Sequence, residues 1–350
     1  MPTEVIQVDA RRPDPAAIAR AAECLQRGGL VAFPTETVYG LGAHALDRHA
    51  VARLFDAKGR PASDPLIVHV AALSDVAPLT RSVSAVARLL ASRFWPGPLT
   101  LIFPRAPAVP PEVTAGLDTV AIRVPAHPVA RALIEAARLP IAAPSANLFT
   151  RPSPTRAAHV LDDLNDRIDI VLDAGPADVG VESTVLDLTR DPPVVLRPGA
   201  VTLEQLQAVV PSVAVWAGAA TERTPAPSPG MLPRHYAPRT PMTLYEGEAA
   251  AVRAAVLTAT RDALAAGRRV GVLVTDERRP WFDDLPIVVG ALGSERDAGQ
   301  VAARLYDALR QLDAAQLDLI LAPAVPGDEG LWRAVRDRLR RAAAHAIRAS

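Results

Sequence analysis

Hydrophobic and polar residues alternate in short runs through the first 210 residues, and longer segments with helical spacing separate these runs. Strands are predicted at 5–8, 30–33, 66–70, 99–103, 120–124, 140–143, 168–172, from 181 onward, and at 194–196. Helices are predicted at 15–27, 48–57, 74–93, 127–138, 155–165 and 202–209. In the strand 66–70, the period of two puts Ile67 and His69 on one face and Leu66, Val68 and Val70 on the other. The pattern predicts an α/β fold.

The chain after residue 241 shows the same alternation on a smaller scale. Strands are predicted at 242–245, 269–274, 287–289 and 318–321, and helices at 249–266, 297–313 and 329–347. This order is typical of a small three-layer, Rossmann-like α/β domain with a mostly parallel sheet. Residues 211–241 are rich in Ala, Pro, Thr, Ser and Gly, which predicts an extended linker. We therefore expect domains at 1–210 and 242–350, joined by a linker at 211–241.

Polar side chains stand at the ends of many predicted strands in the first domain. A loop is predicted after the strand 30–33, and it carries Thr35, Glu36, Thr37 and Tyr39 together with the flexible Gly40 and Gly42. The residues that share a place near a strand or helix end are Thr37, Lys58, Arg60, His69, Thr119, Arg123, Ser145, Asn147, Ser183 and Arg197. Because so many polar residues stand at the ends of strands and helices in this half of the chain, we expect them to line one shared cleft that binds an anion.

Composition narrows the class of protein. The 350 residues include 38 basic and 38 acidic ones, for a net charge of +0, which argues against a protein held to nucleic acid by bulk charge. The single cysteine, Cys24, excludes an intramolecular disulfide and any multi-thiolate zinc site. No apolar run approaches a membrane span of roughly 20 residues, and the first residues contain no apolar signal core. We expect a soluble, cytoplasmic protein.

The standard phosphate-loop, dinucleotide, zinc-protease and serine-hydrolase motifs are absent from the sequence. Arg60, Arg123 and Arg197 instead favour a substrate with several anionic groups, such as a nucleoside triphosphate with a carboxylate partner. Each arginine taken alone is more often part of a surface ion pair. Likewise His69 could be a core residue, and Ser145 and Asn147 could simply close a turn. The arginine-rich last helix is interpreted as a solvated face rather than an RNA-binding one.

Eight strings in order resemble one family: FPTETVYGLG, KGRP followed by PLIVHV, FWPGPLTLIF, TAGLDTVAIRVPAHP, APSAN, RPSPT, GVESTVLD and LRPG. They are similar to the Sua5/YrdC family of threonylcarbamoyl-AMP synthases over residues 5–210. SPGMLPRHYAP and the α/β tail resemble the longer Sua5 branch. The resemblance implies a twisted, open, mixed sheet with helices and a cationic concave cleft, followed by the Sua5-type second domain.

The resemblance also implies a reaction. Members combine L-threonine, bicarbonate or CO2 and ATP, with Mg²⁺, to give L-threonylcarbamoyl-AMP and pyrophosphate. Partner proteins then transfer the threonylcarbamoyl group to position 37 of tRNAs that read ANN codons. Direct tRNA binding by this chain is expected to be weak or absent, and no residue is expected to be a dedicated metal ligand.

Site residues follow from the same resemblance. L-threonine is expected at Thr37, His69, Arg123, the backbone of Ala143, and Ser183. ATP is expected at Lys58, Arg60, Asp64, Thr119, Ser145, Asn147, Ser153, Arg197 and Tyr236. Of these, Lys58, Arg60, Ser145 and Asn147 are expected to act in catalysis. The linker, with Tyr236 and His235, is expected to lie over the cleft. Asp64 stands where the family often carries asparagine, so its side chain is expected to face Mg²⁺ or solvent, or only its backbone to contribute.

Two rival functions remain. A YrdC-type enzyme that adenylates carbamoyl phosphate for metallocentre maturation would share the cleft, but such modules sit in longer, cysteine-bearing chains. A non-catalytic RNA-binding protein would also use a cationic cleft, and the zero net charge and the scarcity of aromatic residues count against it.

Overall fold

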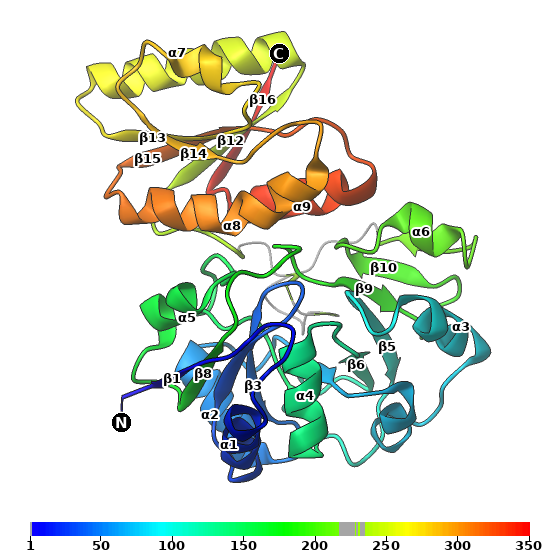
Figure 1. Ribbon diagram of the computed structural model, residues 1–350. Helices are drawn as coiled ribbons and strands as arrows, with labels where there is room; N and C mark the ends of the chain where they lie inside the picture. Colours follow the sequence, from blue (N-terminus) through cyan, green and yellow to red (C-terminus); the bar gives the residue numbers. More distant parts are fainter. Residues whose placement is uncertain (1, 217–227, 229, 232–234) are drawn as a thin grey trace. The chain divides into compact units, whose positions relative to one another are not determined.

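The computed structural model describes residues 2–216, 228, 230–231 and 235–350. The chain divides into two compact units, the first made of residues 1–149 and 153–233 and the second of residues 150–152 and 234–350 (Figure 1). Much of the predicted linker, 217–227, 229 and 232–234, lies outside the described residues. No helix in the described ranges is both long and apolar enough to cross a bilayer.

The first unit contains an eleven-stranded mixed sheet in the order β1-β8-β2-β3-β7-β4-β6-β5-β9-β10-β11. Its strands are β1 (Glu4–Gln7), β2 (Val31–Pro34), β3 (Tyr39–His44), β4 (Ile67–His69), β5 (Leu99–Pro104), β6 (Thr119–Arg123), β7 (Ile141–Ala142), β8 (Ile170–Asp173), β9 (Thr184–Asp187), β10 (Val194–Arg197) and β11 (Ala214–Val215). Its helices are α1 (Pro15–Gln26), α2 (Arg48–Lys58), the 3₁₀ helix η1 (Leu73–Leu79), α3 (Ala85–Phe94), α4 (Pro128–Ala137), α5 (Ala157–Leu164) and α6 (Leu203–Gln207).

Local signals in the sequence fix the helix that leads to the site. The Asp47 side chain caps α2 by accepting a hydrogen bond from the backbone N–H of His49. The helix ends at Gly59, which adopts the left-handed conformation with φ 62°. Lys58 is therefore the last helical residue, and Arg60 follows the reversal of the chain. The sequence correctly predicts this helix and its end.

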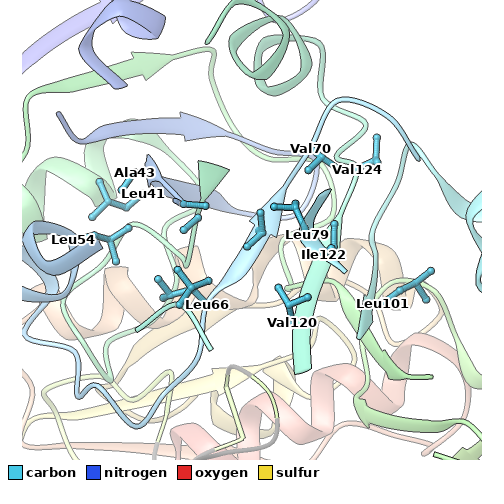
Figure 2. Close-up of a cluster of buried hydrophobic side chains, with 14 of the residues drawn as sticks. Leu41, Ala43, Leu54, Leu66, Val70, Leu79, Leu101, Val120, Ile122 and Val124 are labelled. Carbon is cyan, nitrogen blue, oxygen red and sulfur yellow. The ribbon is translucent and has the colours of Figure 1, made fainter. Parts of the chain in front are cut away.

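The main apolar core lies on one face of the central strands. Leu66, Val68 and Val70 belong to it, together with Leu41 of β3 and Leu54 of α2 (Figure 2). Phe33 of β2 belongs to a second core, in which α1 and α4 pack on the opposite face of the sheet. The predicted alternation in 66–70 is confirmed, because Ile67 belongs to a separate apolar cluster rather than to the core of its neighbours.

Two predictions for this unit are wrong. The predicted loop at 35–42 is a tight turn that ends at Val38, and Tyr39–His44 form β3, antiparallel to β2. Gly42 permits this pairing, since a Cβ there would lie 2.9 Å from side-chain carbons of both Phe33 and Ile141. The predicted helix 74–93 is two helices, η1 and α3, because Pro78 limits the first and Ser84 caps the second.

The second unit is a parallel five-stranded sheet in the order β14-β13-β15-β12-β16, with α7 on one face and α8 and α9 on the other (Figure 1). Its elements are β12 (Met242–Gly247), α7 (Ala249–Ala265), β13 (Val270–Val274), the 3₁₀ helix η2 (Arg279–Phe282), β14 (Val288–Ala291), α8 (Ala298–Ala314), β15 (Leu319–Pro323), α9 (Gly330–Ala342) and β16 (His345–Ala349). The predicted helix 329–347 is too long: α9 ends at Ala342, and His345–Ala349 instead pair with β12 as an edge strand.

The interpretation of α9 as a solvated face is also wrong for one arginine. Arg338 is 1% exposed and forms a 2.6 Å ion pair with Asp337. Arg336 and Arg340 both form ion pairs with Glu246, so much of the positive charge of α9 is balanced by acidic residues of the same unit.

Candidate functional site

Strand alternation brings two of the predicted site residues, His69 and Arg123, to one face of the central sheet. Ile67 and His69 of β4 share a face, as do Ala121 and Arg123 of β6, and His69 pairs in register with Arg123. Ile67 and Ala121 belong to an apolar cluster on this face that also contains Ile102, Val185, Leu196 and Met231. Polar side chains therefore extend this surface at the carboxyl ends of β4 and β6.

Arg123 is held firmly although it is almost fully buried. Its Nη1 donates to the Thr37 hydroxyl at 2.9 Å, and its Nε donates to the Gly97 carbonyl at 3.1 Å. Its Nη2 lies 2.6 Å from a carboxylate oxygen of Glu36. The Thr37 hydroxyl in turn shares a 2.8 Å hydrogen bond with the Thr35 hydroxyl. The turn after β2 thus presents a hydroxyl and a carboxylate to the guanidinium group.

His69 is a buried, neutral imidazole. Burial first, and the Arg123 charge second, lower the pKa of His69 from 6.5 to about 3. The ring meets Phe33 edge to face, with centroids 6.4 Å apart. At neutral pH this side chain can accept or donate one hydrogen bond without carrying charge.

Ser183 and Arg197 form a second polar cluster. Arg197 Nε donates to the Ser183 carbonyl at 3.1 Å, and its Nη2 donates to the Ser183 hydroxyl at 3.2 Å. The Ser183 hydroxyl also shares a 2.8 Å hydrogen bond with Thr100 of β5. Gly199 is needed beside them, because a Cβ there would lie 2.4 Å from the backbone nitrogen of Thr184.

Lys58 organises the segment after β7. Its ammonium group donates to the backbone carbonyls of Ser145 and Asn147, each at 2.5 Å, and it is 1% exposed. The Asn147 amide donates to the Leu148 carbonyl at 2.7 Å. Ser145 also forms an isolated bridge with Gly40 of β3, so this segment pairs with the strand that follows the turn.

Asp64 does not face solvent, contrary to one of the expectations for it. It is 0% exposed, and its carboxylate lies 2.9 Å from Arg60 Nη2. Burial raises the pKa of Asp64, while the charges of Arg60, Lys58 and Arg197 act in the opposite direction. The three cations therefore surround one buried carboxylate. This ion pairing is the physical reason that an aspartate is accommodated here.

The remaining predicted residues of the first unit are placed as follows. Ser153 is fully buried and donates to Glu182, next to Ser183. The backbone nitrogen of Ala143 donates to the Ile67 carbonyl at 2.9 Å, so Ala143 lies beside β4. Thr119, at the start of β6, is partly exposed and lines a shallow hollow with Pro65 and Ala121. Within the described residues, the Thr119 side chain forms no hydrogen bond with the other site residues.

Tyr236 belongs to the second unit. It is 1% exposed, and its ring lies 5.6 Å from that of Tyr306 and 5.2 Å from the guanidinium carbon of Arg338. His235 stacks edge to face on Tyr236, with centroids 4.2 Å apart. Tyr236 also has a left-handed backbone, with φ 62°. Such a conformation in a bulky residue persists only where the surroundings enforce it.

Two residues that face the site were not assigned a role from the sequence. Glu36 lies between Thr35 and Thr37, and an acidic residue between two hydroxyl residues could have indicated a functional role. For Thr100, the sequence shows only a polar residue within an apolar strand. In the described part of the chain, no three His, Cys, Asp or Glu side chains gather in a way that could hold a metal ion.

Comparison with known proteins agrees with this arrangement. A family model described as telomere recombination, for Sua5, YciO and YrdC proteins, matches residues 23–199. A second, described as the threonylcarbamoyl-AMP synthase C-terminal domain, matches residues 201–344. A threonylcarbamoyl-AMP synthase of Bacillus subtilis is 47% identical over 93% of this chain and 92% of its own length. The chain belongs to the Sua5 family of threonylcarbamoyl-AMP synthases.

Other Sua5 relatives extend the match. A threonylcarbamoyl-AMP synthase of Pyrococcus abyssi is 44% identical over 93% of this chain and 94% of its own length. The crystal structure of P. abyssi Sua5 complexed with L-threonine superposes with a TM-score of 0.92 at 42% identity, covering 99% of this chain and 100% of that one. The predicted family and the predicted fold class are both confirmed.

Proposed function

We propose that this chain synthesises L-threonylcarbamoyladenylate from L-threonine, bicarbonate or CO2, and ATP, releasing pyrophosphate. The observation that carries the proposal is the buried Arg123 guanidinium, held by Thr37 at the carboxyl end of β6 in a chain of the Sua5 family. A guanidinium fixed on a strand end is suited to a small carboxylate. The P. abyssi protein that superposes on the whole chain was crystallised with L-threonine.

The threonine half of the site consists of Thr37, His69, Arg123, the Ala143 backbone and Ser183. Arg123 is positioned to bind the α-carboxylate. Short hydroxyls such as Thr37 and Ser183 match the polar groups of an amino acid. Because His69 is neutral, it adds a hydrogen-bonding group without repelling or attracting the zwitterion.

The nucleotide half consists of Lys58, Arg60, Asp64, Thr119, Ser145, Asn147, Ser153 and Arg197, and a contribution from Tyr236 stays a prediction. Lys58, Arg60 and Arg197 share Asp64 as a nearby counter-charge, so the cluster keeps a net positive charge. Such a cluster offsets the charge of a triphosphate and the charge that grows on departing pyrophosphate.

The chemistry needs no nucleophile from the protein. The threonine amine adds to CO2 and releases a proton to water, which gives a carbamate, and a carbamate oxygen attacks the α-phosphorus of ATP as the bond to pyrophosphate breaks. Catalysis then rests on placing the two substrates together and on electrostatic stabilisation. Lys58, Arg60, Ser145 and Asn147 are the residues we assign to this step.

Mg²⁺ is proposed to enter with ATP as part of the substrate. The described residues offer no cluster of three ligands, and the Asp64 carboxylate is directed to Arg60. Mg²⁺ commonly keeps several waters and binds through substrate phosphates, which fits this arrangement.

The product is proposed to serve tRNA modification. Downstream proteins would transfer the threonylcarbamoyl group to position 37 of tRNAs that read ANN codons. Direct tRNA binding and a cytoplasmic location stay predictions.

The test is pyrophosphate release from ATP with bicarbonate present, with L-threonine added or omitted. Strict dependence on threonine, with serine much poorer, is the expected result. Release that ignores threonine and responds to carbamoyl phosphate would favour a maturation-type enzyme. Absence of release together with tight, salt-dependent tRNA binding would indicate a binding protein.

A further inference from the structure

Glu36 is a buried carboxylate that the proposed function leaves without a role. It lies in the turn between β2 and β3, and its side chain is 11% exposed. One oxygen lies 2.6 Å from Arg123 Nη2, yet neither oxygen has a hydrogen-bond donor in suitable geometry among the described residues. A buried carboxylate without donors is costly, and native proteins retain such groups mainly at functional sites.

Glu36 is not required to orient Arg123. The guanidinium group already donates to the Thr37 hydroxyl and to the Gly97 carbonyl, and these two contacts fix its plane. The backbone of the turn is also held independently, because the carbonyls of Glu36 and Thr37 accept hydrogen bonds from Val179 and Gly180. Neither the orientation of Arg123 nor the backbone of the turn therefore depends on the carboxylate, which can serve a ligand.

The neighbouring charges indicate what kind of group it receives. His127 also senses the charge of Glu36: burial lowers the pKa of His127, and the charges of Glu36 and Asp178 act against that shift. The His127 Nδ1 already accepts a hydrogen bond from Val129, so this ring nitrogen is not a donor to Glu36. The unmet need is for N–H donors, and an ammonium group supplies three.

We propose that Glu36 binds the α-ammonium group of L-threonine while Arg123 binds its α-carboxylate. A guanidinium and a carboxylate side by side complement a zwitterion, in which the opposite charges are likewise adjacent. Glu36 would thereby place the nitrogen that forms the carbamate. The inference rests on the proposed function and adds a specificity-determining residue to it.

The test compares two ligands and two variants. L-threonine is compared with (R)-3-hydroxybutyrate, which keeps the carboxylate and the hydroxyl and lacks the amino group. In Glu36→Gln we expect L-threonine to bind at least tenfold more weakly, because a charge-assisted hydrogen bond is lost. The hydroxybutyrate should bind as before, or more tightly, since Arg123 loses a competing anion. Glu112→Gln is the matched control, because Glu112 pairs with Arg48 on the surface.

Each outcome decides the matter. Equal weakening of both ligands in Glu36→Gln would make Glu36 a structural residue, and unchanged binding of both would also overturn the inference. If Glu36→Gln does not fold, Glu36→Asp takes its place, with a smaller loss expected for L-threonine alone. Failure of the unmodified protein to bind L-threonine would overturn the proposed function itself, which distinguishes that failure from a failure of Glu36.

Discussion

The ammonium group of Lys58 lies 2.5 Å from the carbonyl oxygen of Asn147 and donates a hydrogen bond to it. Lys58 ends α2, whereas Asn147 lies in the segment after β7, so a cation at a helix end fixes the path of a distant loop. The same nitrogen holds the Ser145 carbonyl. The charge that we propose to offset a triphosphate and the shape of the loop that carries Ser145 and Asn147 therefore depend on one side chain.

Replacing Lys58 should impair both stability and turnover. Lys58→Met removes the ammonium donor from the buried Asn147 carbonyl and leaves the Ser145 carbonyl only the Asn147 backbone N–H, which is expected to destabilise the first unit by about 1–3 kcal/mol. Pyrophosphate release should fall at least a hundredfold, because the charge and the loop are both lost. Urea unfolding and the pyrophosphate assay measure the two effects. A variant with normal stability and normal turnover would show that the contacts to Ser145 and Asn147 are incidental.

Arg123→Lys should separate the two substrates. A lysine keeps the charge but cannot reproduce the fork that contacts Thr37 and Gly97 at the same time. We expect the KM for threonine to rise more than tenfold while ATP binding, measured by calorimetry, stays within about twofold. Equal loss of both ligands in a folded Arg123→Lys protein would contradict the assignment of Arg123 to threonine alone.

The alternation of side chains along a strand could be predicted from the sequence, because a period of two fixes the face of the sheet on which each residue lies. In β4 it predicted that His69 lies on the face opposite to Val68, without knowledge of the neighbouring strands. The contacts of Ser183 could not be predicted in this way. They depend on the parallel pairing of β9 with β5, which brings Thr100 alongside, and on the antiparallel pairing of β9 with β10, which carries Arg197.

The errors have physical causes of the same kind. Tyr39–His44 contains two glycines and no β-branched residue, so local propensity gave only a weak sign of a strand. Its pairing with β2 and its packing against Phe33 stabilise the strand. The strand His345–Ala349 exists through pairing with β12. The burial of Arg338 could not be predicted either, because the ring that it contacts, Tyr236, lies about a hundred residues earlier in the sequence.

The buried His69 should make the first unit less stable in acid. Its pKa in the folded protein, about 3, lies below the ordinary value of 6.5, so the unfolded chain binds a proton first as the pH falls. The contribution is complete above pH 6.5 and is lost progressively as the pH falls towards 3. Between pH 6.5 and pH 5 the loss is on the order of 2 kcal/mol.

Urea unfolding at pH 7.5 and pH 5 tests this expectation. His69→Gln should show a smaller loss of stability between the two pH values than the unmodified protein. His345→Gln is the matched control, because His345 is exposed on β16, and it should behave like the unmodified protein. An unchanged acid sensitivity in His69→Gln would mean that other groups cause the effect.

Tyr236 should stabilise the second unit as well as act in turnover. A residue in an extended linker, as predicted for Tyr236, could be truncated to alanine without loss of the fold. Burial of the ring against Tyr306 and Arg338 predicts a different result. Removing a buried aromatic ring typically costs about 3–5 kcal/mol, and here it also exposes the guanidinium group of Arg338 to an unfilled space.

Tyr236→Phe separates packing from chemistry. Because it keeps the ring, its thermal midpoint should stay close to that of the unmodified protein, whereas Tyr236→Ala should unfold at a clearly lower temperature. Turnover measured below both midpoints then reports on the hydroxyl group alone. If Tyr236→Phe keeps full activity, the ring and not its hydroxyl serves the reaction; if Tyr236→Ala is both stable and active, neither role assigned to Tyr236 is correct.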